Sequence, residues 1–234
     1  NDLTTYRLVS GCPNNLGGLT PSLGGCAVFS STNGGTSFVN DVLLKNTSVT
    51  LQGYFGQNSA ISSTATLLSF NDGSTNDNVY LYHLNSGTWT FRFRVPGGVV
   101  SKPSVLKFIV GGGFGMVNIY QTSDFVTWTL QQNISRTYSG TVRMVDFIGG
   151  EMACYVCPDN NVVHIYNSGG GGTFLHAGMF SPFPGEGTII SMSTSGEYTV
   201  FCTSSRLYVV KRTGITNHAF TQSFAIANCK SCVM

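Results

Sequence analysis

The sequence predicts an all-β protein, a five-bladed β-propeller of four-stranded antiparallel blades that takes up residues 1–234 as a single domain. A hairpin motif recurs five times along the chain, and no segment shows a convincing helical period. The recurrence distance is typical of propeller blades of about four strands each. Five blades of about 46 residues would use about 230 residues, and the chain has 234.

The motif is clearest at residues 117–130, where a strand is followed by a polar turn with Asp124 and then by Thr-Trp at the start of a second strand. Similar hairpins lie at residues 27–38, 79–89, 163–174 and 207–220. The intervals between their closing aromatic residues are 51, 39, 46 and 46 residues. These aromatic residues are Phe38, Trp89, Trp128, Phe174 and Phe220.

The residue types of the motif have a physical reason. A hairpin turn leaves backbone N–H groups without partners in the sheet, and a short Asp or Asn side chain accepts hydrogen bonds from them. We therefore expect Asn33 and Asp124 to hold their turns. The aromatic residue that follows lies over the hairpin and packs towards the next blade, which buries a large apolar area.

Residues 31–38, Ser-Thr-Asn-Gly-Gly-Thr-Ser-Phe, resemble the Asp-box of sialidases and related propellers, Ser-x-Asp-x-Gly-x-Thr-Trp. They depart from it by Asn for Asp, Ser for Thr and Phe for Trp. Residues 123–128 resemble a shortened version of the box. The resemblance covers five short segments, and it implies that the box is a structural turn on the face away from the ligand. Asn33 and Asp124 are then poor catalytic candidates.

Composition favours a β-rich extracellular, phage or virion surface protein. Only 9% of residues are charged, whereas 29 are Gly and 16 are Phe. The net charge is +2 and the 12 basic residues are scattered, so we expect no nucleic acid partner. No apolar run approaches 18 residues, so we expect no membrane span. The missing N-terminal Met and signal-peptide pattern indicate a processed chain.

Seven cysteines leave at least one thiol outside any intramolecular disulfide set. Cys154 and Cys157 form a Cys-x-x-Cys pair, which is one half of many zinc sites. They lie in a predicted strand, where residues three apart point to opposite faces, so a shared zinc ion is disfavoured. We expect the cysteines to be buried small residues, with Cys229 and Cys232 bridged to each other or to Cys12 as the alternative.

Alternating apolar residues and turn residues predict the strands. We expect Phe224 to Ala227 to pair with the N-terminal strand and close the ring. The other expected strands are residues 6–9, 26–30, 38–44, 49–55, 64–70, 79–83, 89–94, 97–101, 105–110, 142–147, 152–157, 188–193 and 198–203.

If each motif turn joins the third and fourth strands of a blade, the remaining loops lie on the opposite face. Resemblance to propeller enzymes and lectins implies that a ligand binds on that face. The residues there with suitable chemistry are the candidates for ligand binding. They are Asp72, Asp77, Lys102, Phe114, Arg136, Tyr138, Asp159, Phe183 and Glu186.

Four of these candidates are acids, which keeps a glycoside hydrolase as an alternative, because that reaction needs two facing carboxylates about 5 to 10 Å apart. Sialidases use an arginine cluster, however, and Arg136 is the one Arg in these loops. We therefore assign no catalytic residue and favour a protein without enzymatic activity.

We expect no cofactor and no metal site. The loop from Asp72 to Asp77 has oxygen ligands enough for calcium, but not the spacing of an EF-hand loop, so a polar turn is favoured. The histidines share no metal-ligand spacing and are expected in packing or surface positions. They are His83, His164, His176 and His218.

The sequence thus predicts a lectin-like or receptor-binding propeller outside cells or on a virion, whose partner is a glycan or a cell-surface or virion protein. A sugar would stack on Phe or Tyr and form hydrogen bonds with Asn or Asp. A structural subunit of a larger assembly, with residues 228–234 as its docking segment, is the other alternative.

Overall fold

The computed structural model describes most strands of the chain and the motif turns between them. Within the described ranges the protein forms β-strands and no helix. The described residues are 5–12, 25–44, 59–62, 64, 66–71, 78–101, 103–104, 106–112, 116–134, 142–148, 153–158, 162–168, 172–181, 188–195, 197–203, 205–214 and 218–225.

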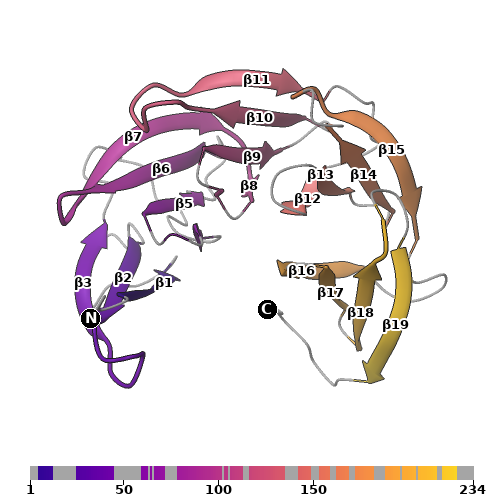
Figure 1. Ribbon diagram of the computed structural model, residues 1–234, viewed down its shortest axis with the longest axis horizontal. Helices are drawn as coiled ribbons and strands as arrows, with labels where there is room; N and C mark the ends of the chain where they lie inside the picture. Colours follow the sequence, from indigo (N-terminus) through magenta and orange to yellow (C-terminus); the bar gives the residue numbers. More distant parts are fainter. Residues whose placement is uncertain are drawn as a thin grey trace. The chain divides into compact units, whose positions relative to one another are not determined.

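The described strands are numbered β1 to β19 in chain order (Figure 1). They are β1 Tyr6–Cys12, β2 Gly25–Ser31, β3 Val39–Leu44, β4 Ser59–Ile61, β5 Leu67–Asn71, β6 Asn78–Asn85, β7 Thr88–Pro96, β8 Val99–Val100, β9 Lys107–Gly111, β10 Val117–Gln121, β11 Thr129–Asn133, β12 Val142–Ile148, β13 Ala153–Pro158, β14 Val163–Asn167, β15 Leu175–Phe180, β16 Ile189–Ser195, β17 Tyr198–Thr203, β18 Arg206–Arg212 and β19 His218–Ala225.

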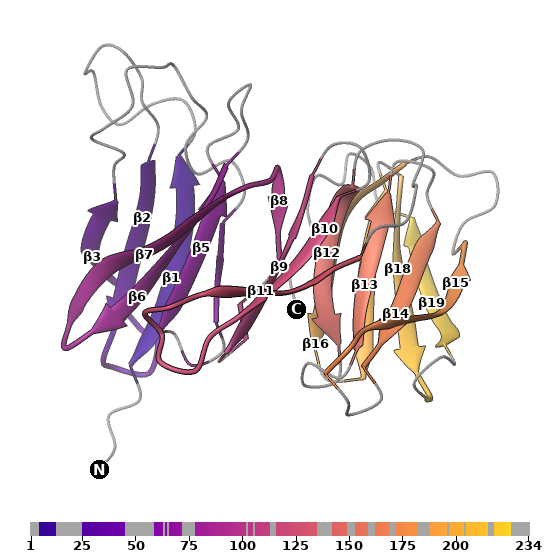
Figure 2. The same cartoon turned by 90° about the horizontal axis from the view of Figure 1, so that it is seen from above.

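The strands form five antiparallel sheets, and in each sheet consecutive strands are neighbours. We call them blade one (β1–β3), blade two (β4–β7), blade three (β8–β11), blade four (β12–β15) and blade five (β16–β19). Blade one has three strands within the described residues and the others have four. Figure 2 shows the four strands of blade four side by side. The fold is a five-bladed β-propeller, as the sequence predicts.

The chain divides into two compact units, residues 1–108 with 121–129, and residues 109–120 with 130–234. Each unit has an apolar core built from strand residues that alternate between the two faces of a sheet. The first core joins Cys26, Val28 and Leu44 of blade one to Leu68, Phe70, Tyr80 and Trp89 of blade two. The second joins Tyr155, Val163 and Ile165 of blade four to Ile189, Phe201, Tyr208 and Val210 of blade five. The single domain over residues 1–234 remains a prediction.

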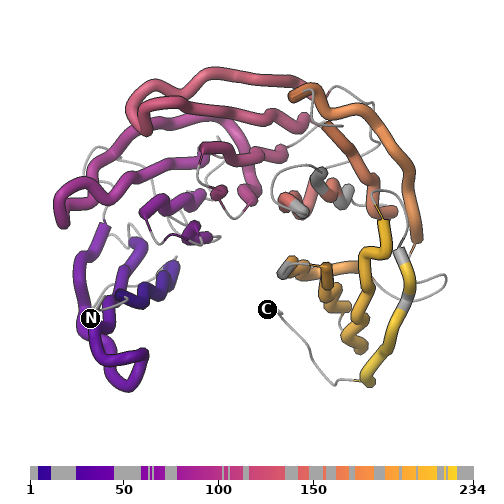
Figure 3. The backbone as a smooth tube through the Cα atoms, in the orientation of Figure 1, coloured from indigo at the N-terminus to yellow at the C-terminus, as the bar shows by residue number. Residues whose placement is uncertain are grey.

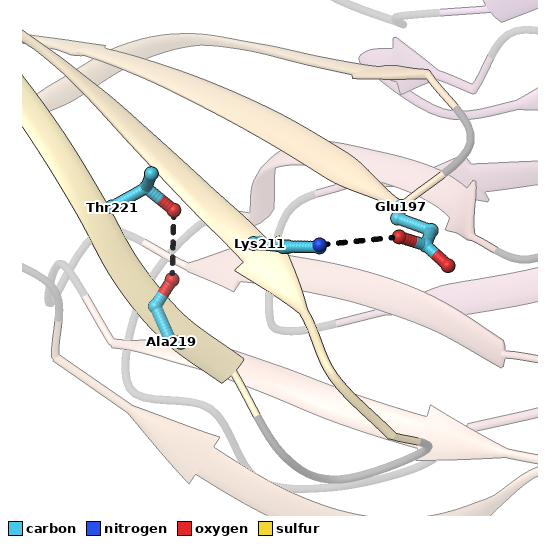
Figure 4. Close-up of polar contacts among 4 residues, drawn as sticks. All are labelled: Glu197, Lys211, Ala219 and Thr221. Atoms are coloured by element: carbon cyan, nitrogen blue, oxygen red, sulfur yellow. Dashed lines mark hydrogen bonds and ion pairs between the residues drawn. The ribbon is translucent and has the colours of Figure 1, made fainter.

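A β-bulge recurs in the hairpin formed by the last two described strands of a blade. The register shifts at one step in blades one, two, four and five, and leaves one extra residue in the last strand. In blade five this residue is Thr221, whose Oγ donates to the carbonyl oxygen of Ala219 at 3.4 Å (Figure 4). Lys211 of β18 lies 3.7 Å from the carboxylate of Glu197, an exposed pair that adds little stability.

The second strands of blades two and three start later than predicted, and β4 at Ser59–Ile61 was not predicted. The expected strand 49–55 lies outside the described residues. The next strand starts at Leu67 and not at Thr64, because the Ser62 hydroxyl accepts hydrogen bonds from the N–H groups of Thr66 and Leu67 and forms a turn there. Likewise Ser104 accepts from the N–H of Lys107, so β9 starts two residues later than expected.

The prediction that Phe224 pairs with the N-terminal strand is wrong. Phe224 belongs to β19 and lies opposite Leu207 of β18, and its neighbour Ala225 lies opposite Arg206. The physical reason is proximity along the chain, because a hairpin partner costs less loop-closure entropy than a strand some 200 residues away. Residues 226 and 227 lie outside the described part.

Cys202 is disulfide-bonded, so the expectation of a buried, unbridged cysteine does not hold at this position. No helix among the described residues is long and apolar enough to cross a membrane.

Candidate functional site

In blade one the motif turn is held by the Asn33 side chain. Its Oδ1 accepts from the backbone N–H of Ser37 at 3.0 Å and from the Ser31 hydroxyl at 2.7 Å. The Ser31 hydroxyl in turn accepts from the N–H of Gly35 at 3.1 Å. Gly34 and Gly35 have φ of 73° and 82°, which glycine adopts without strain. The turn is thus satisfied internally, as its residue types predict.

Blade three repeats this arrangement with Asp124. Its Oδ1 accepts from the N–H groups of Val126 at 2.9 Å and Thr127 at 2.7 Å, and from the Thr122 hydroxyl at 3.0 Å. The turn is one residue shorter than in blade one, since Thr127 is three residues after Asp124 and Ser37 is four after Asn33. The backbone hydrogen bonds from Thr127 and Val126 lower the pKa of Asp124 from 3.8 to about 2.

Three of the closing aromatic residues are buried, and the contacts of Trp89 and Phe174 run to the preceding blade and not, as expected, to the next one. Trp128 is 6% exposed and meets Phe108 edge to face, with ring centroids 5.0 Å apart. Phe108 in turn contacts Phe93 of blade two at 6.3 Å. Trp89 is 9% exposed and belongs to the core that blades one and two share. These rings therefore have a packing position and no free face for a ligand.

Phe174 of blade four is held by blade three. The side-chain amide of Gln132 donates to the carbonyl oxygen of Phe174 at 2.8 Å and accepts from its N–H at 2.6 Å. The neighbouring Gln131 donates to the carbonyl oxygen of Gly172. The ring of Phe174 is buried and lies 6.2 Å from that of Phe147.

Blades one and five depart from the pattern. Phe38 is 36% exposed, in contrast to Trp89, Trp128 and Phe174. In blades one, two and four the extra bulge residue follows the closing aromatic by three positions, as Arg92 follows Trp89. In blade five that residue is Thr221. The register therefore aligns His218, and not Phe220, with the closing aromatics.

The motif turn of blade three also carries a ring contact that the sequence did not indicate. Phe125 has a φ of 59°, and its ring stacks on that of His83 of blade two, with centroids 4.7 Å apart and an angle of 9°. Burial, and then the nearby charge of Arg92, lower the pKa of His83. The neutral imidazole thus serves as a packing surface.

At the opposite end of the strands, the described residues of blade two are rich in amide side chains. Asn71 ends β5 and Asn78 begins β6, so they flank the loop 72–77, and both are buried. Asn71 Nδ2 donates to the carbonyl oxygen of Gly98 at 2.5 Å. This bond ties the end of β5 to the segment between β7 and β8.

The same end of blade three has a similar frame. Asn133 Nδ2 donates to Asn118 Oδ1 at 2.7 Å, and the N–H of Ile134 donates to the carbonyl oxygen of Val117 at 2.8 Å. The N–H of Gly112 donates to the carbonyl oxygen of Met116 at 3.0 Å, which closes the base of the loop 113–115. These contacts tie together the described residues on either side of residues 113–115.

The nine candidates for ligand binding lie outside the described residues. They are Asp72, Asp77, Lys102, Phe114, Arg136, Tyr138, Asp159, Phe183 and Glu186. The same holds for the calcium alternative at Asp72 and Asp77.

The acids within the described part of the chain all have structural partners. Asp41 lies 3.8 Å from Arg7, Glu197 lies beside Lys211, and Asp124 holds its turn. Asp146 of β12 is buried and accepts from the Thr194 hydroxyl of β16 at 2.6 Å, which links blades four and five. None of these four carboxylates is arranged as a pair with another for acid–base catalysis.

Sequence reasoning missed one cluster. His164 of β14 and His176 of β15 are 12 residues apart in the chain, yet their ring nitrogens lie 3.3 Å apart. Their adjacency depends on the turn length and on the bulge between Ile165 and Tyr166, so a spacing rule for metal ligands could not find it. Within the described residues, no group of three or more His, Cys, Asp or Glu could hold a metal ion.

The chain matches no protein-family model and no curated protein. Its fold is similar to that of several solved structures. The periplasmic gluconolactonase of Pseudomonas aeruginosa has a TM-score of 0.66 at 15% identity, over 96% of this chain and 69% of that one. A structure of the mitotic checkpoint complex has a TM-score of 0.61 at 12% identity, over 96% and 69%.

A protein of unknown function from Desulfotomaculum acetoxidans has a TM-score of 0.63 at 10% identity, over 87% of this chain. The chain spans 64% of the length of that protein. At such identities these likenesses show the propeller fold alone.

Proposed function

We propose that this protein is a non-enzymatic β-propeller, displayed outside cells or on a virion, that binds glycans through the loops opposite its motif turns. The observation that carries the proposal is the pair of buried amides, Asn71 and Asn78, that frame the loop with Asp72 and Asp77. The Asn71 amide bonds the carbonyl oxygen of Gly98 and so anchors one end of the loop, and in this proposal the carboxylates within the loop accept hydrogen bonds from sugar hydroxyls.

Two further observations support the choice of this end. At the motif end, Asn33 and Asp124 are engaged in their own turns and Trp128 is buried, which leaves them poorly placed to recognise a ligand. At the loop end, the ends of the loop with Phe114 are tied together by the Gly112–Met116 hydrogen bond, and in this proposal the Phe114 ring stacks on a sugar ring.

A disulfide and the low charge content support the proposed location outside cells. Cys202 is disulfide-bonded, and disulfides persist in oxidising compartments and on virion or cell surfaces. The low share of charged residues, 9%, and the polar uncharged turns also suit such a protein.

A glycan array followed by titration tests the proposal. We expect saturable binding to one class of glycan, and Phe114→Ala or Phe183→Ala should weaken it about tenfold, which corresponds to about 1.4 kcal/mol. Val126→Ala is the matched control, because Val126 is 54% exposed but lies in a motif turn. It should leave binding unchanged. Absence of binding across a broad array contradicts the glycan proposal and leaves a protein partner.

A glycoside hydrolase is the second candidate. The observation in its favour is that the four described acids have structural roles. The catalytic carboxylates would then come from Asp72, Asp77, Asp159 and Glu186. It requires turnover on some polysaccharide that Asp159→Asn or Glu186→Gln abolishes. Lack of turnover across a polysaccharide panel removes this candidate.

A further inference from the structure

The hairpin of β14 and β15 brings two imidazole rings together in blade four. The backbone of this hairpin can be followed in Figure 3. Nδ1 of His164 lies 3.3 Å from Nε2 of His176, and the ring planes are inclined by 49°. His164 is 7% exposed, whereas His176 is exposed, so solvent can reach the pair from one side.

The sheet fixes this arrangement. His176 lies opposite Tyr166, and the two rings meet edge to face with centroids 5.3 Å apart. His164 lies opposite Met179, and the bulge between these two cross-strand pairs brings the histidines closer than a regular register would. The thioether of Met179, which is 65% exposed, belongs to the same edge of the sheet.

The distance between the two nitrogens distinguishes a direct hydrogen bond from a pair spaced to chelate one metal ion. A value of 3.3 Å is long for an N–H donor bond, which is usually about 2.9–3.0 Å. Two nitrogens bound to one tetrahedral ion at about 2.0–2.1 Å are separated by about 3.3–3.4 Å, so the apo spacing matches a chelate. A site with one buried and one accessible imidazole is also partly preorganised.

We propose that His164 and His176 form a two-histidine site for one divalent first-row transition-metal ion. Imidazole nitrogens favour Cu²⁺ over Zn²⁺ in the usual order of affinities. No third His, Cys, Asp or Glu joins the pair within the described ranges. Water completes the coordination, with the Met179 thioether as a soft additional ligand.

The test is calorimetric titration of untagged, chelator-treated protein with Cu²⁺ and with Zn²⁺. We expect one ion per chain, bound more tightly for Cu²⁺. His176→Asn should weaken Cu²⁺ binding on the order of 100-fold, because the second imidazole acts as an intramolecular ligand. His176 is exposed, so this variant should fold, which a circular dichroism spectrum verifies. His83→Asn is the control, since His83 stacks on Phe125 and should not contribute.

Electron paramagnetic resonance of the Cu²⁺ form gives an independent result. Hyperfine coupling to two nitrogens is expected in the wild type and to fewer in His176→Asn. Equal Cu²⁺ affinity in the wild type and His176→Asn overturns the proposal. So does a wild-type protein that binds no ion when Cu²⁺ is in large excess.

Discussion

Asp124 shows how one side chain determines a turn. A single carboxylate oxygen accepts from two backbone N–H groups and one hydroxyl, and in blade one the amide of Asn33 takes the same place. The sequence indicated this role correctly, because the chemistry is local: acceptor and donors lie within four residues of each other.

The pH dependence of stability should report this turn. The pKa of Asp124 is lowered from 3.8 to about 2 on folding, so its contribution is complete above about pH 4 and is lost as pH falls towards 2. Asp124→Asn keeps an acceptor for the turn but cannot titrate. Thermal melts from pH 6 to pH 2 should show a smaller drop in melting temperature for Asp124→Asn than for the wild type. Identical drops would mean that the turn does not hold the carboxylate in solution.

Trp128 should act through packing. Its ring is buried against Phe108, and its indole nitrogen has no hydrogen-bond partner within the described residues. Trp128→Ala should lower the free energy of unfolding by about 3–5 kcal/mol. Trp128→Phe should cost clearly less, since blade four has Phe174 in the same position of its motif. Urea denaturation measures both. If Trp128→Ala is as stable as the wild type, Trp128 does not stabilise the fold by packing.

At the scale of the element, blades three and four are joined by the Gln132 side chain, whose amide pairs with a backbone N–H and C=O as a neighbouring strand would. Gln132 both donates to and accepts from the backbone of Phe174, so it satisfies a donor and an acceptor beside a buried ring. Removing such a hydrogen bond destabilises the fold by more than the bond stabilises it, because the backbone groups that remain are buried and lack a partner.

Gln132→Ala should therefore lower the free energy of unfolding by about 1–3 kcal/mol. The control is Thr129→Ala in the same strand, since Thr129 is exposed and its hydroxyl only reaches the carbonyl oxygen of Gln121 at 3.5 Å. Denaturant unfolding of the two variants should separate them. Equal effects would show that the amide does not link the blades.

The elements also show how far sequence patterns lead. Hairpins with tight turns were predicted within a few residues, because alternation and turn chemistry are local. The strand Ser59–Ile61 was missed because three residues are too few to show a period. The pairing of Phe224 and the meeting of His164 with His176 depend on register, which is decided between strands and not within one.

At the scale of the whole molecule, the two ends of the strands differ. The motif turns and their buried aromatic residues stabilise the blades, and the connections at the other end vary in length and residue type. The sequence placed eight of the nine candidate ligand residues in connections at that other end, whereas Lys102 lies between β8 and β9, the first two strands of blade three, in a connection of the motif end. It could not arrange them in space, because loop conformations are not fixed by a period.

The central claim is that the buried motif aromatics, Trp89, Trp128 and Phe174, are packing residues and are not part of a ligand site. The chain has two tryptophans, Trp89 and Trp128, and both are motif residues that are 9% and 6% exposed. Acrylamide quenching of the intrinsic fluorescence therefore tests the claim directly. We predict blue-shifted emission and quenching far weaker than in the guanidinium-unfolded protein. Native emission and quenching that match those of the unfolded chain would contradict it.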